Sequence, residues 1–251
     1  MVRRLSDDKP DGDSISRIAP FPPGGIAVVF GASGGIGSAL TAQLRAHPAF
    51  SIVSGYSRSG STALDLDVES SIEAVAAEVQ QCGADVRLLI NATGVLEGDG
   101  CVAEKSWRQL NPAAMSRAFA VNAIGPALLA KHFFPLLPRQ GKCIFVTLSA
   151  RVGSIGDNRL GGWYSYRASK AALNQIMRTA AIELRRSWPD AVCVALHPGT
   201  VDTLLSARFA EPGLEVQSPD TAAKRILTLL DRLTAASSGE FFDQRGRPIV
   251  W

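Results

Sequence analysis

The sequence predicts an α/β protein with a doubly wound parallel sheet, in which helices cover both faces and form three α/β/α layers. Three observations predict this class. Short apolar runs alternate with longer helix-like stretches, the runs are apolar on both faces, and a glycine-rich turn directly follows the first run. The chain of 251 residues suits one domain, which we place at residues 26–251, behind an N-terminal arm at residues 1–25.

The arm mixes charged residues with prolines and lacks the apolar core of a secretory signal, so we expect it to be flexible or loosely docked. The formal net charge of +3 is small, and no long basic run indicates a nucleic-acid surface. We also find no apolar stretch that we expect to span a membrane. These features predict a cytoplasmic protein.

The four cysteines lie far apart and form no C-x-x-C pair, so we predict no bound metal. Free, buried thiols in a reducing compartment are the expectation. Cys101 falls in a loop-like stretch, where the sequence also allows exposure.

The expected strands are short apolar runs bounded by turn-forming residues. Ile26–Phe30, for example, is rich in β-branched residues and lies between glycines. The others are expected at residues 51–54, 86–90, 143–148, 191–196 and 239–242. Ligands of doubly wound sheets bind beyond the carboxyl ends of the strands, so the residues that directly follow each run are the candidates for chemistry.

The expected helices lie between these runs. Residues 68–81 place Ile72, Val75 and Val79 on one face. The remaining helices are expected at residues 35–46, 113–137, within 162–187, and at 219–233. Right-handed crossovers between parallel strands place such helices on both faces of the sheet.

A glycine-rich turn, Gly31–Gly37, separates the first strand from the first helix. Residues without a Cβ allow so tight a turn and let backbone N–H groups approach a pyrophosphate, while the helix N-terminus adds partial positive charge. A plain glycine loop is the alternative, but the strand before it and the helix after it favour a dinucleotide site. The residues expected to contact the cofactor here are Gly31, Ser33, Gly35, Ile36 and Gly37.

The end of the second strand indicates which nucleotide is bound. An NAD site carries an acidic side chain about 20 residues past the glycines, where it binds the ribose 2′-hydroxyl. Here the stretch 55–59 has no carboxylate, and it offers the forked cation of Arg58 and the hydroxyls of Ser57 and Ser59. These groups match a 2′-phosphate, so we predict NADP(H) rather than NAD(H). An ordinary exposed loop arginine is the alternative.

Tyr166 and Lys170 form the most specific pair in the chain, because their spacing puts them on one helix face, one turn apart. A phenol with a pKa near ~10 is a poor base at neutral pH, and a nearby ammonium lowers that pKa. Tyr166 can then exchange a proton with a substrate oxygen, and Lys170 can also hold the nicotinamide ribose. An amphipathic surface pair is the alternative. Tyr164 is off this face and is expected to line the pocket or to pack.

Two further side chains complete the predicted catalytic group. Ser149 follows the strand expected at 143–148, where its hydroxyl can hydrogen-bond to a substrate carbonyl and orient it. Asn122 lies in the middle of a long helix, and a buried asparagine there needs a hydrogen-bond partner. A solvent-facing asparagine is the alternative.

These motifs, in this order, resemble those of the short-chain dehydrogenase/reductase family over about residues 26–245. The glycine spacing resembles the family's, although Phe30 replaces its usual threonine. Segments 149–154 and 161–166, with the tail that ends at Trp251, are similar to the C-factor-like subgroup. The resemblance implies a Rossmann fold. It also implies a homodimer or homotetramer, because family members commonly pair through two long helices.

The resemblance implies roles for individual residues as well. In the family, an aspartate that matches Asp67 contacts the adenine, and an asparagine that matches Asn122 kinks its helix and holds a water in a proton relay with the lysine and tyrosine. Thr93 is a departure in size from the family's Asn-Asn-Ala-Gly segment. Cofactor contacts are thereby implied for Asp67, Val68, Asn91, Ala92, Thr93, Gly94, Tyr166, Lys170, Pro198, Gly199, Val201 and Thr203.

Together these features predict an enzyme that transfers a hydride between NADP(H) and a small-molecule carbonyl or alcohol substrate, with Tyr166 as general acid/base. The segment Leu204–Ser218 is expected to form a short apolar lid that admits small or flat hydrophobic compounds. His197 is expected to be structural. Two alternatives stay open, an NADP(H)-binding regulatory or signalling protein with little turnover, and a structural interaction protein that binds no nucleotide.

Overall fold

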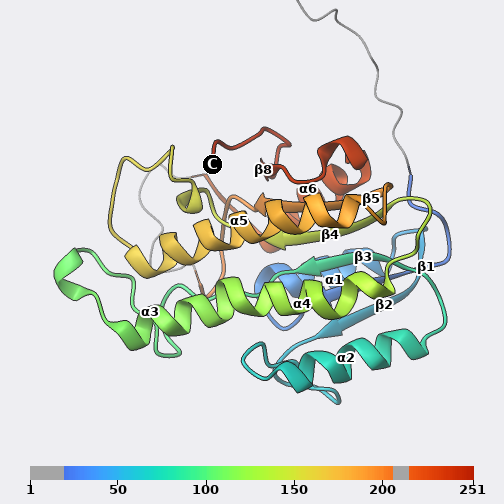
Figure 1. Cartoon of the computed structure of the whole chain (residues 1–251), viewed down its shortest axis with the longest axis horizontal. Coiled ribbons are helices and arrows are strands. Elements are labelled where there is room, and N and C mark those ends of the chain that lie inside the picture. The colour runs from blue at the N-terminus through green and yellow to red at the C-terminus, as the bar shows by residue number, and fades with distance from the viewer. Residues whose placement is uncertain (1–19, 206–214) are drawn as a thin grey trace, which may run out of the picture.

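The computed structural model describes residues 20–205 and 215–251. Within them, one sheet of parallel strands has the order β2-β1-β3-β4-β5-β8 (Figure 1). Its strands are β1 (Gly25–Phe30), β2 (Phe50–Tyr56), β3 (Val86–Asn91), β4 (Cys143–Leu148), β5 (Ala191–His197) and β8 (Phe241–Asp243). A separate short pair joins β6 (Thr200–Val201) to β7 (Val216–Gln217). The chain winds outward from β1 in both directions, as the predicted doubly wound topology requires.

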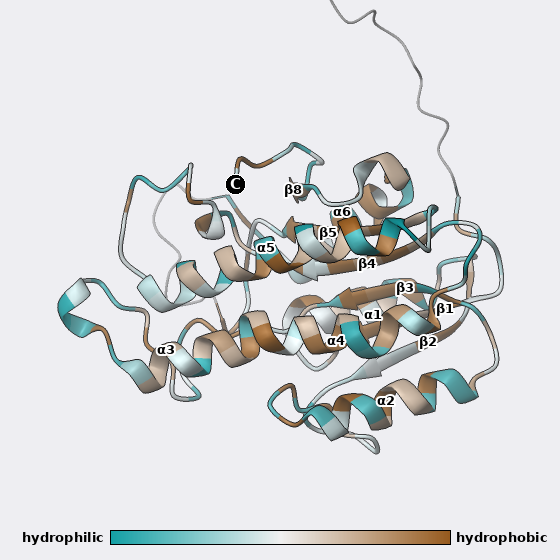
Figure 2. Ribbon diagram, in the orientation of Figure 1, coloured by the Kyte–Doolittle hydropathy of each residue, from teal (hydrophilic) through white to brown (hydrophobic). Residues whose placement is uncertain are grey.

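Helices cover both faces of this sheet. They are α1 (Gly35–Leu44), α2 (Glu69–Gln81), α3 (Pro112–Phe119), α4 (Gly125–Phe133), α5 (Tyr164–Arg185) and α6 (Pro219–Arg232). Side chains of α2, α4 and α5 join one buried apolar cluster with the strands, and those of α1 and α6 join a second cluster on the opposite face. The central strands are hydrophobic, whereas the helices are polar on part of their surface (Figure 2). The predicted three-layer α/β/α class is therefore confirmed.

The second strand is longer than the sequence indicates. It is expected at residues 51–54, but β2 runs to Tyr56 because its pairing with β1 continues through Gly55. A Cβ at Gly55 would lie only 2.7 Å from the Cβ of Ala32, so this position requires glycine. Serine and glycine are poor strand formers, and the neighbouring strand is what holds them extended.

The helical stretch expected over residues 113–137 is not uniform. A π-helical segment, Ala120–Ile124, joins α3 to α4, and a 3-10 turn follows at Phe134–Leu136. Single π-helical turns inside α-helices are frequent at functional sites. This one contains Asn122, whose side chain is buried.

One helical segment of the described residues, Pro112–Leu136, is long and apolar enough to cross a membrane by length and composition. The expectation that no stretch of the sequence is long and apolar enough to span a membrane is therefore wrong. In this structure 44% of the most apolar window is buried inside the protein, and core helices meet the same criterion. The segment packs along α5 in one layer of the fold.

The expected end of the N-terminal arm at residue 25 also needs correction. Residues 1–19 lie outside the described part of the chain. Phe21 is buried with its ring centroid 5.2 Å from that of Phe50, and Gly25 already belongs to β1. Residues 20–25 therefore belong to the folded domain, because a buried aromatic side chain ties them to it.

Three cysteines, Cys101, Cys143 and Cys193, are buried free thiols, whereas Cys82 is exposed at the end of α2. Exposure at Cys101, which the sequence allows, is not observed. The Sγ of Cys101 lies 3.9 Å from the backbone oxygen of Ala114, under the first turn of α3.

Candidate active site

The glycine turn lies at the carboxyl end of β1 and leads directly into α1. Gly31 has a φ of +84°, in the left-handed region that favours glycine. A Cβ at Gly37 would lie 2.1 Å from the backbone oxygen of Gly31, so only glycine lets α1 start so close to the strand. A Cβ at Gly35 would lie 2.8 Å from Cγ2 of Thr203, which places Thr203 against the turn.

A cavity of about 370 Å³ opens beside this turn. Its walls come from the glycine turn, from the ends of β2 and β3, and from the loops that follow them. The lining includes Gly31, Ser33, Gly34, Ser57, Arg58, Asp67, Ala92, Thr93 and Gly94. The lining thus offers backbone N–H groups, hydroxyls and a guanidinium, which are the donors that a dinucleotide phosphate needs. The residues fit the predicted cofactor at this end.

Charged side chains form a network at the rim of the cavity. Arg58 pairs with Asp99 at 2.9 Å, Asp99 pairs with Arg117 at 2.7 Å, and Arg117 also pairs with Asp67. The stretch 55–59 itself has no carboxylate, but Asp99, from outside it, pairs with Arg58. Asp99 reaches it from a tight turn after β3, in which Asp99 itself has a φ of +54°. Asp67, which is expected to contact adenine, is held by Arg117 in this structure.

The segment after β3 is braced by its own side chains. The Oδ1 atom of Asn91 accepts hydrogen bonds from the backbone N–H of Thr93 at 3.1 Å and from its hydroxyl at 2.6 Å. Ala92, Thr93 and Gly94 line the cavity, whereas Asn91 is the last residue of β3 and does not line it. Val68 does not line this cavity; it precedes α2 and is half exposed.

Asn122 connects this segment to the helix layer. Its side-chain amide pairs with the backbone of Val95, accepting from the N–H at 2.9 Å and donating to the oxygen at 2.8 Å. It also donates to the hydroxyl of Ser169 at 3.1 Å. The side-chain oxygen and nitrogen of this buried asparagine thus both have hydrogen-bond partners. The alternative of a solvent-facing Asn122 is wrong.

Tyr166 and Lys170 lie on successive turns of α5 and are both buried. The Nζ atom of Lys170 lies 5.8 Å from the ring centroid of Tyr166, and it donates to the backbone oxygen of Leu148 at 2.9 Å. A Cβ at Gly94 would lie 3.5 Å from both Lys170 Nζ and Asn122 Oδ1, so both side chains lie close to Gly94, which lines the cavity. The alternative of an exposed surface pair is wrong.

Burial controls the protonation of this pair. It raises the pKa of the Tyr166 phenol, and it lowers the pKa of the Lys170 ammonium to about 7. The expectation that Lys170 lowers the pKa of Tyr166 is not met in this structure. The reason is that loss of solvation on burial disfavours the charged form of each group.

Ser149 follows β4 and is also buried. Its hydroxyl donates to Oδ1 of Asn174 at 2.6 Å, and Nδ2 of Asn174 lies 3.4 Å from the backbone oxygen of Gly153. Asn174 is one turn beyond Lys170 on α5, so the tyrosine, lysine and asparagine share one helix face. Sequence reasoning missed Asn174, although its spacing from Tyr166 and Lys170 is the signal that could have found it.

The segment after β5 lies beside the same edge of the sheet. Gly199 has a φ of +82°, and the backbone oxygen of Pro198 accepts from Nε2 of Gln217 at 2.6 Å. Val201 is buried in β6. Burial lowers the pKa of His197 to about 4, so its imidazole is neutral at physiological pH, in keeping with a structural role.

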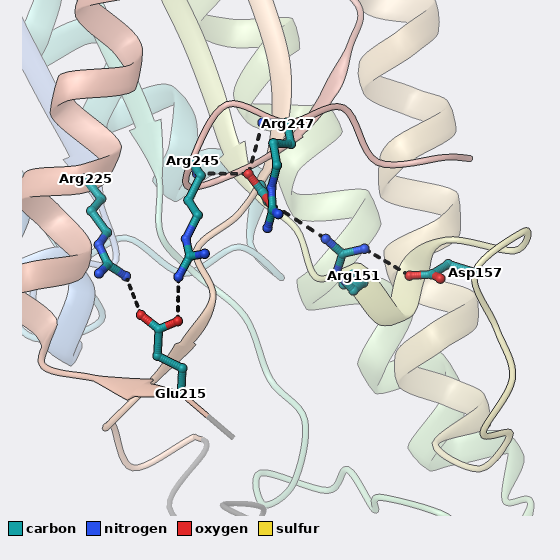
Figure 3. Close-up of polar contacts among 7 residues, drawn as sticks. Arg151, Asp157, Glu215, Arg225, Arg245 and Arg247 are labelled. Carbon is teal, nitrogen blue, oxygen red and sulfur yellow. Dashed lines mark hydrogen bonds and ion pairs between the residues drawn. The ribbon is translucent and has the colours of Figure 1, made fainter. Parts of the chain in front are cut away.

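Ion pairs fix the loops beyond β8 (Figure 3). The buried carboxylate of Asp243 accepts from Nε of Arg247 at 2.8 Å and lies 3.8 Å from Arg151. Arg151 follows Ser149 closely in the chain and also pairs with Asp157 at 3.1 Å. The end of β8 thereby anchors the turn that follows the predicted catalytic serine.

Most of the predicted lid, Leu204–Ser218, falls on residues 206–214, outside the described part of the chain. Directly after these residues, Glu215 pairs with Arg225 of α6 at 3.3 Å and with Arg245 at 2.5 Å (Figure 3). Two cations from separate segments thus pair with Glu215, the first described residue after residues 206–214.

The predicted catalytic side chains do not line the cavity described above. Among the described residues, Val95 and Leu96 do line it, and the backbone of Val95 pairs with the side chain of Asn122. Tyr166 instead joins a small apolar cluster with Leu96, Ala103 and Trp163. Tyr164, expected to line the pocket or to pack, is partly exposed.

Away from this edge, Glu69, Glu73 and His132 bring possible metal-ligand atoms within 4.8 Å of one another. The cysteine pattern gave no sign of this group. The Oε1 atom of Glu69 already contacts Nζ of Lys131 at 2.5 Å and Nε2 of His132 at 2.8 Å. The ammonium of Lys131 thus occupies the position that a metal ion would take, and we assign these residues to pairing between α2 and α4.

A doubly wound sheet with a glycine turn after its first strand is the architecture of dinucleotide-binding α/β proteins. A family model described as enoyl-(acyl carrier protein) reductase matches residues 31–233. The chain is 37% identical to the C-signal of Myxococcus xanthus over 68% of its own length and 95% of that protein. It is 34% identical to 1-hydroxy-2-glutathionyl-2-methyl-3-butene dehydrogenase of Rhodococcus sp., over 75% of this chain and 78% of the relative.

A solved structure has the same fold. NADPH-bound carbonyl reductase from chicken fatty liver matches with a TM-score of 0.81 and 26% identity, over 94% of this chain and 97% of that one. The chain therefore belongs to the short-chain dehydrogenase/reductase family of oxidoreductases, and the C-signal is among its relatives.

Proposed function

We propose that this chain transfers a hydride between NADP(H) and a carbonyl or alcohol group of a small molecule, with Tyr166 as general acid/base. The observation that carries the proposal is the burial of four polar side chains on neighbouring elements of the fold. Tyr166 and Lys170 on α5, Ser149 after β4 and Asn122 in the π-helical segment are all buried at the carboxyl edge of the sheet. Buried polar groups that converge beside a nucleotide cavity favour catalysis over a purely structural role.

Each side chain has a distinct task. When bound, the nicotinamide supplies or accepts the hydride. Because burial raises the pKa of Tyr166, its hydroxyl stays protonated at neutral pH and can donate a proton to a carbonyl oxygen. Ser149 orients that oxygen once its hydroxyl hydrogen turns from Oδ1 of Asn174 to the substrate. Lys170, which is held by Leu148, fixes the nicotinamide ribose and the phenol. In the oxidation direction, the Tyr166 phenolate takes the proton back.

Arg58, Ser57 and the glycine turn support NADP(H) as the cofactor, since they line one cavity. The NADPH bound to the related carbonyl reductase supports the same choice. Asp99 competes with a 2′-phosphate for Arg58, and Arg117 supplies a second cation at the same rim.

A panel of small aldehydes and ketones, followed by the loss of NADPH absorbance, tests the proposal. We expect turnover in the wild type and a loss of about 10²-fold or more in Tyr166→Phe, with NADPH binding retained. Tight binding of NADPH without turnover across the panel would instead support the second candidate, a cofactor-binding regulatory protein. That candidate draws on the likeness to the C-signal and on the burial of Tyr166 away from the cavity lining. Absence of thermal stabilisation by NADPH would contradict both.

A further inference from the structure

A carboxylate that plays no part in the proposed chemistry is buried next to the proposed general acid. Glu104 is 0% exposed, and both of its carboxylate oxygens face Ser165. One oxygen accepts from the backbone N–H of Ser165 at 3.2 Å, and the other accepts from its hydroxyl. Removing a carboxylate from water is costly unless hydrogen bonds replace its hydration, so this position has a specific use.

Glu104 caps the catalytic helix from a distant part of the chain. The first N–H groups of an α-helix have no partner within the helix, and the partial positive charge there favours an anion. In α5 one of these groups is the N–H of Ser165, and Glu104, which lies in the loop before α3, satisfies it.

The backbone of Glu104 fixes the approach to the same helix. Gly161, Gly162 and Trp163 have φ values of +66°, +65° and +51°, so three successive residues are left-handed. Two of them are glycines, but Trp163 adopts this conformation at a steric cost. The N–H of Trp163 donates to the backbone oxygen of Glu104, which holds the strained residue in place.

Both contacts act on the immediate surroundings of Tyr166. Ser165 precedes it in the chain, and the ring of Trp163 meets the ring of Tyr166 edge-on, with centroids 6.3 Å apart. Lys170 is held separately, through Leu148 of β4. The first turn of α5 therefore sets where the phenol lies relative to the ammonium.

Building on the proposed function, we propose that Glu104 is a positioning residue that caps α5 and thereby fixes the Tyr166 hydroxyl for proton transfer. It does not touch the reacting atoms. Its removal should lower kcat and leave the cofactor site, at the other end of the cleft, unchanged.

The test compares Glu104→Ala and Glu104→Gln with the wild type, well below the unfolding temperature of each variant. We expect kcat of Glu104→Ala to fall by about tenfold or more, because small misplacements of a reacting group slow catalysis strongly. The Kd for NADPH should change by less than about twofold. Glu104→Gln keeps an oxygen that can accept from Ser165, so it should recover most of kcat.

Thr234→Ala serves as the matched control, because it also removes a helix-capping hydrogen bond, in a short 3-10 helix after α6. It should lower thermal stability and leave kcat unchanged. An unchanged kcat in Glu104→Ala, or a loss matched by an equal loss of NADPH affinity, would overturn the proposal.

Crystal structures of the wild type and Glu104→Ala make the test independent of turnover. A displaced first turn of α5 in the variant supports the positioning role, and an unmoved Tyr166 overturns it. Lack of turnover in the wild type, by contrast, would count against the oxidoreductase proposal only, since the displacement can still be measured.

Discussion

The two ends of the candidate site hold their polar groups in opposite ways. At the outer end, Arg58 and Asp99 form an ion pair with side chains 70% and 47% exposed. At the inner end, Lys170 is 3% exposed and donates to a backbone oxygen, while Ser149 and Asn174 meet as neutral, buried partners. The outer end is a set of charges in water, and the inner end is a hydrogen-bonded network within the protein.

This difference determines what each end can control. Exposed ion pairs contribute little free energy and can exchange partners, so the outer end can adapt to an incoming phosphate. Buried polar groups lose much more when a partner is removed, so the inner end keeps one arrangement. We therefore expect substitutions at the outer end to change cofactor affinity modestly and substitutions at the inner end to change rate strongly.

The largest effect is expected at Lys170. Replacing it with methionine keeps an apolar stem of similar length and removes the amine that is held beside Tyr166. We expect kcat to fall by about 10²-fold or more, as for other losses within a general acid/base group. Lys131→Met is the control, because that lysine is exposed and pairs with Glu69 on the helix surface. Near-normal turnover of Lys170→Met by steady-state kinetics would show that the inner network is not catalytic.

The same buried lysine should make stability depend on pH. Its pKa is about 7 in the folded protein, below the ordinary value near 10.4, so the unfolded state binds the proton more tightly between these limits. Stability should therefore increase as pH rises from about 7 to about 10. It should level off above this range, where Lys170 is neutral in both the folded and the unfolded state. The difference in thermal unfolding temperature between wild type and Lys170→Met, followed across this range, isolates the effect. A difference that stays constant with pH would mean that Lys170 is not buried as a free amine.

An intermediate effect is expected at Asn174. In Asn174→Ala the hydroxyl of Ser149 loses the partner that orients it, and we expect kcat to fall by about tenfold with unchanged NADPH affinity. Gln175→Ala is the matched control, since Gln175 is the next residue on α5 and is exposed. If both variants retain full kcat, Ser149 does not depend on this contact.

The smallest effect is expected at the outer end. Asp99→Asn removes the carboxylate that competes with a 2′-phosphate for Arg58, so NADPH should bind about two- to fivefold more tightly, with little change for NADH. Titration of both cofactors by calorimetry measures this. Asp157→Asn, which breaks the exposed pair with Arg151, should change neither affinity. Equal tightening for NADPH and NADH would mean that Arg58 does not meet the 2′-phosphate.

The sequence by itself determined the features that depend on short spacing. Apolar runs on both faces indicated a parallel sheet, the glycines of Gly31–Gly37 indicated a turn too tight for a Cβ, and the interval between Tyr166 and Lys170 indicated one helix face. Each of these depends on backbone geometry that repeats over a few residues. The extension of β2 through Gly55 was missed because its cause lies in the pairing with β1 rather than in the segment itself.

The tertiary structure decided everything that depends on long-range contact. It brought Asp99 to Arg58, Glu104 to Ser165 and Asn174 to Ser149, across separations that local patterns do not encode. It also reversed the expected direction of the pKa of Tyr166, because the desolvation of a side chain depends on all the elements that pack around it. The sequence thus identified which groups can do chemistry, and packing set their charge and their partners.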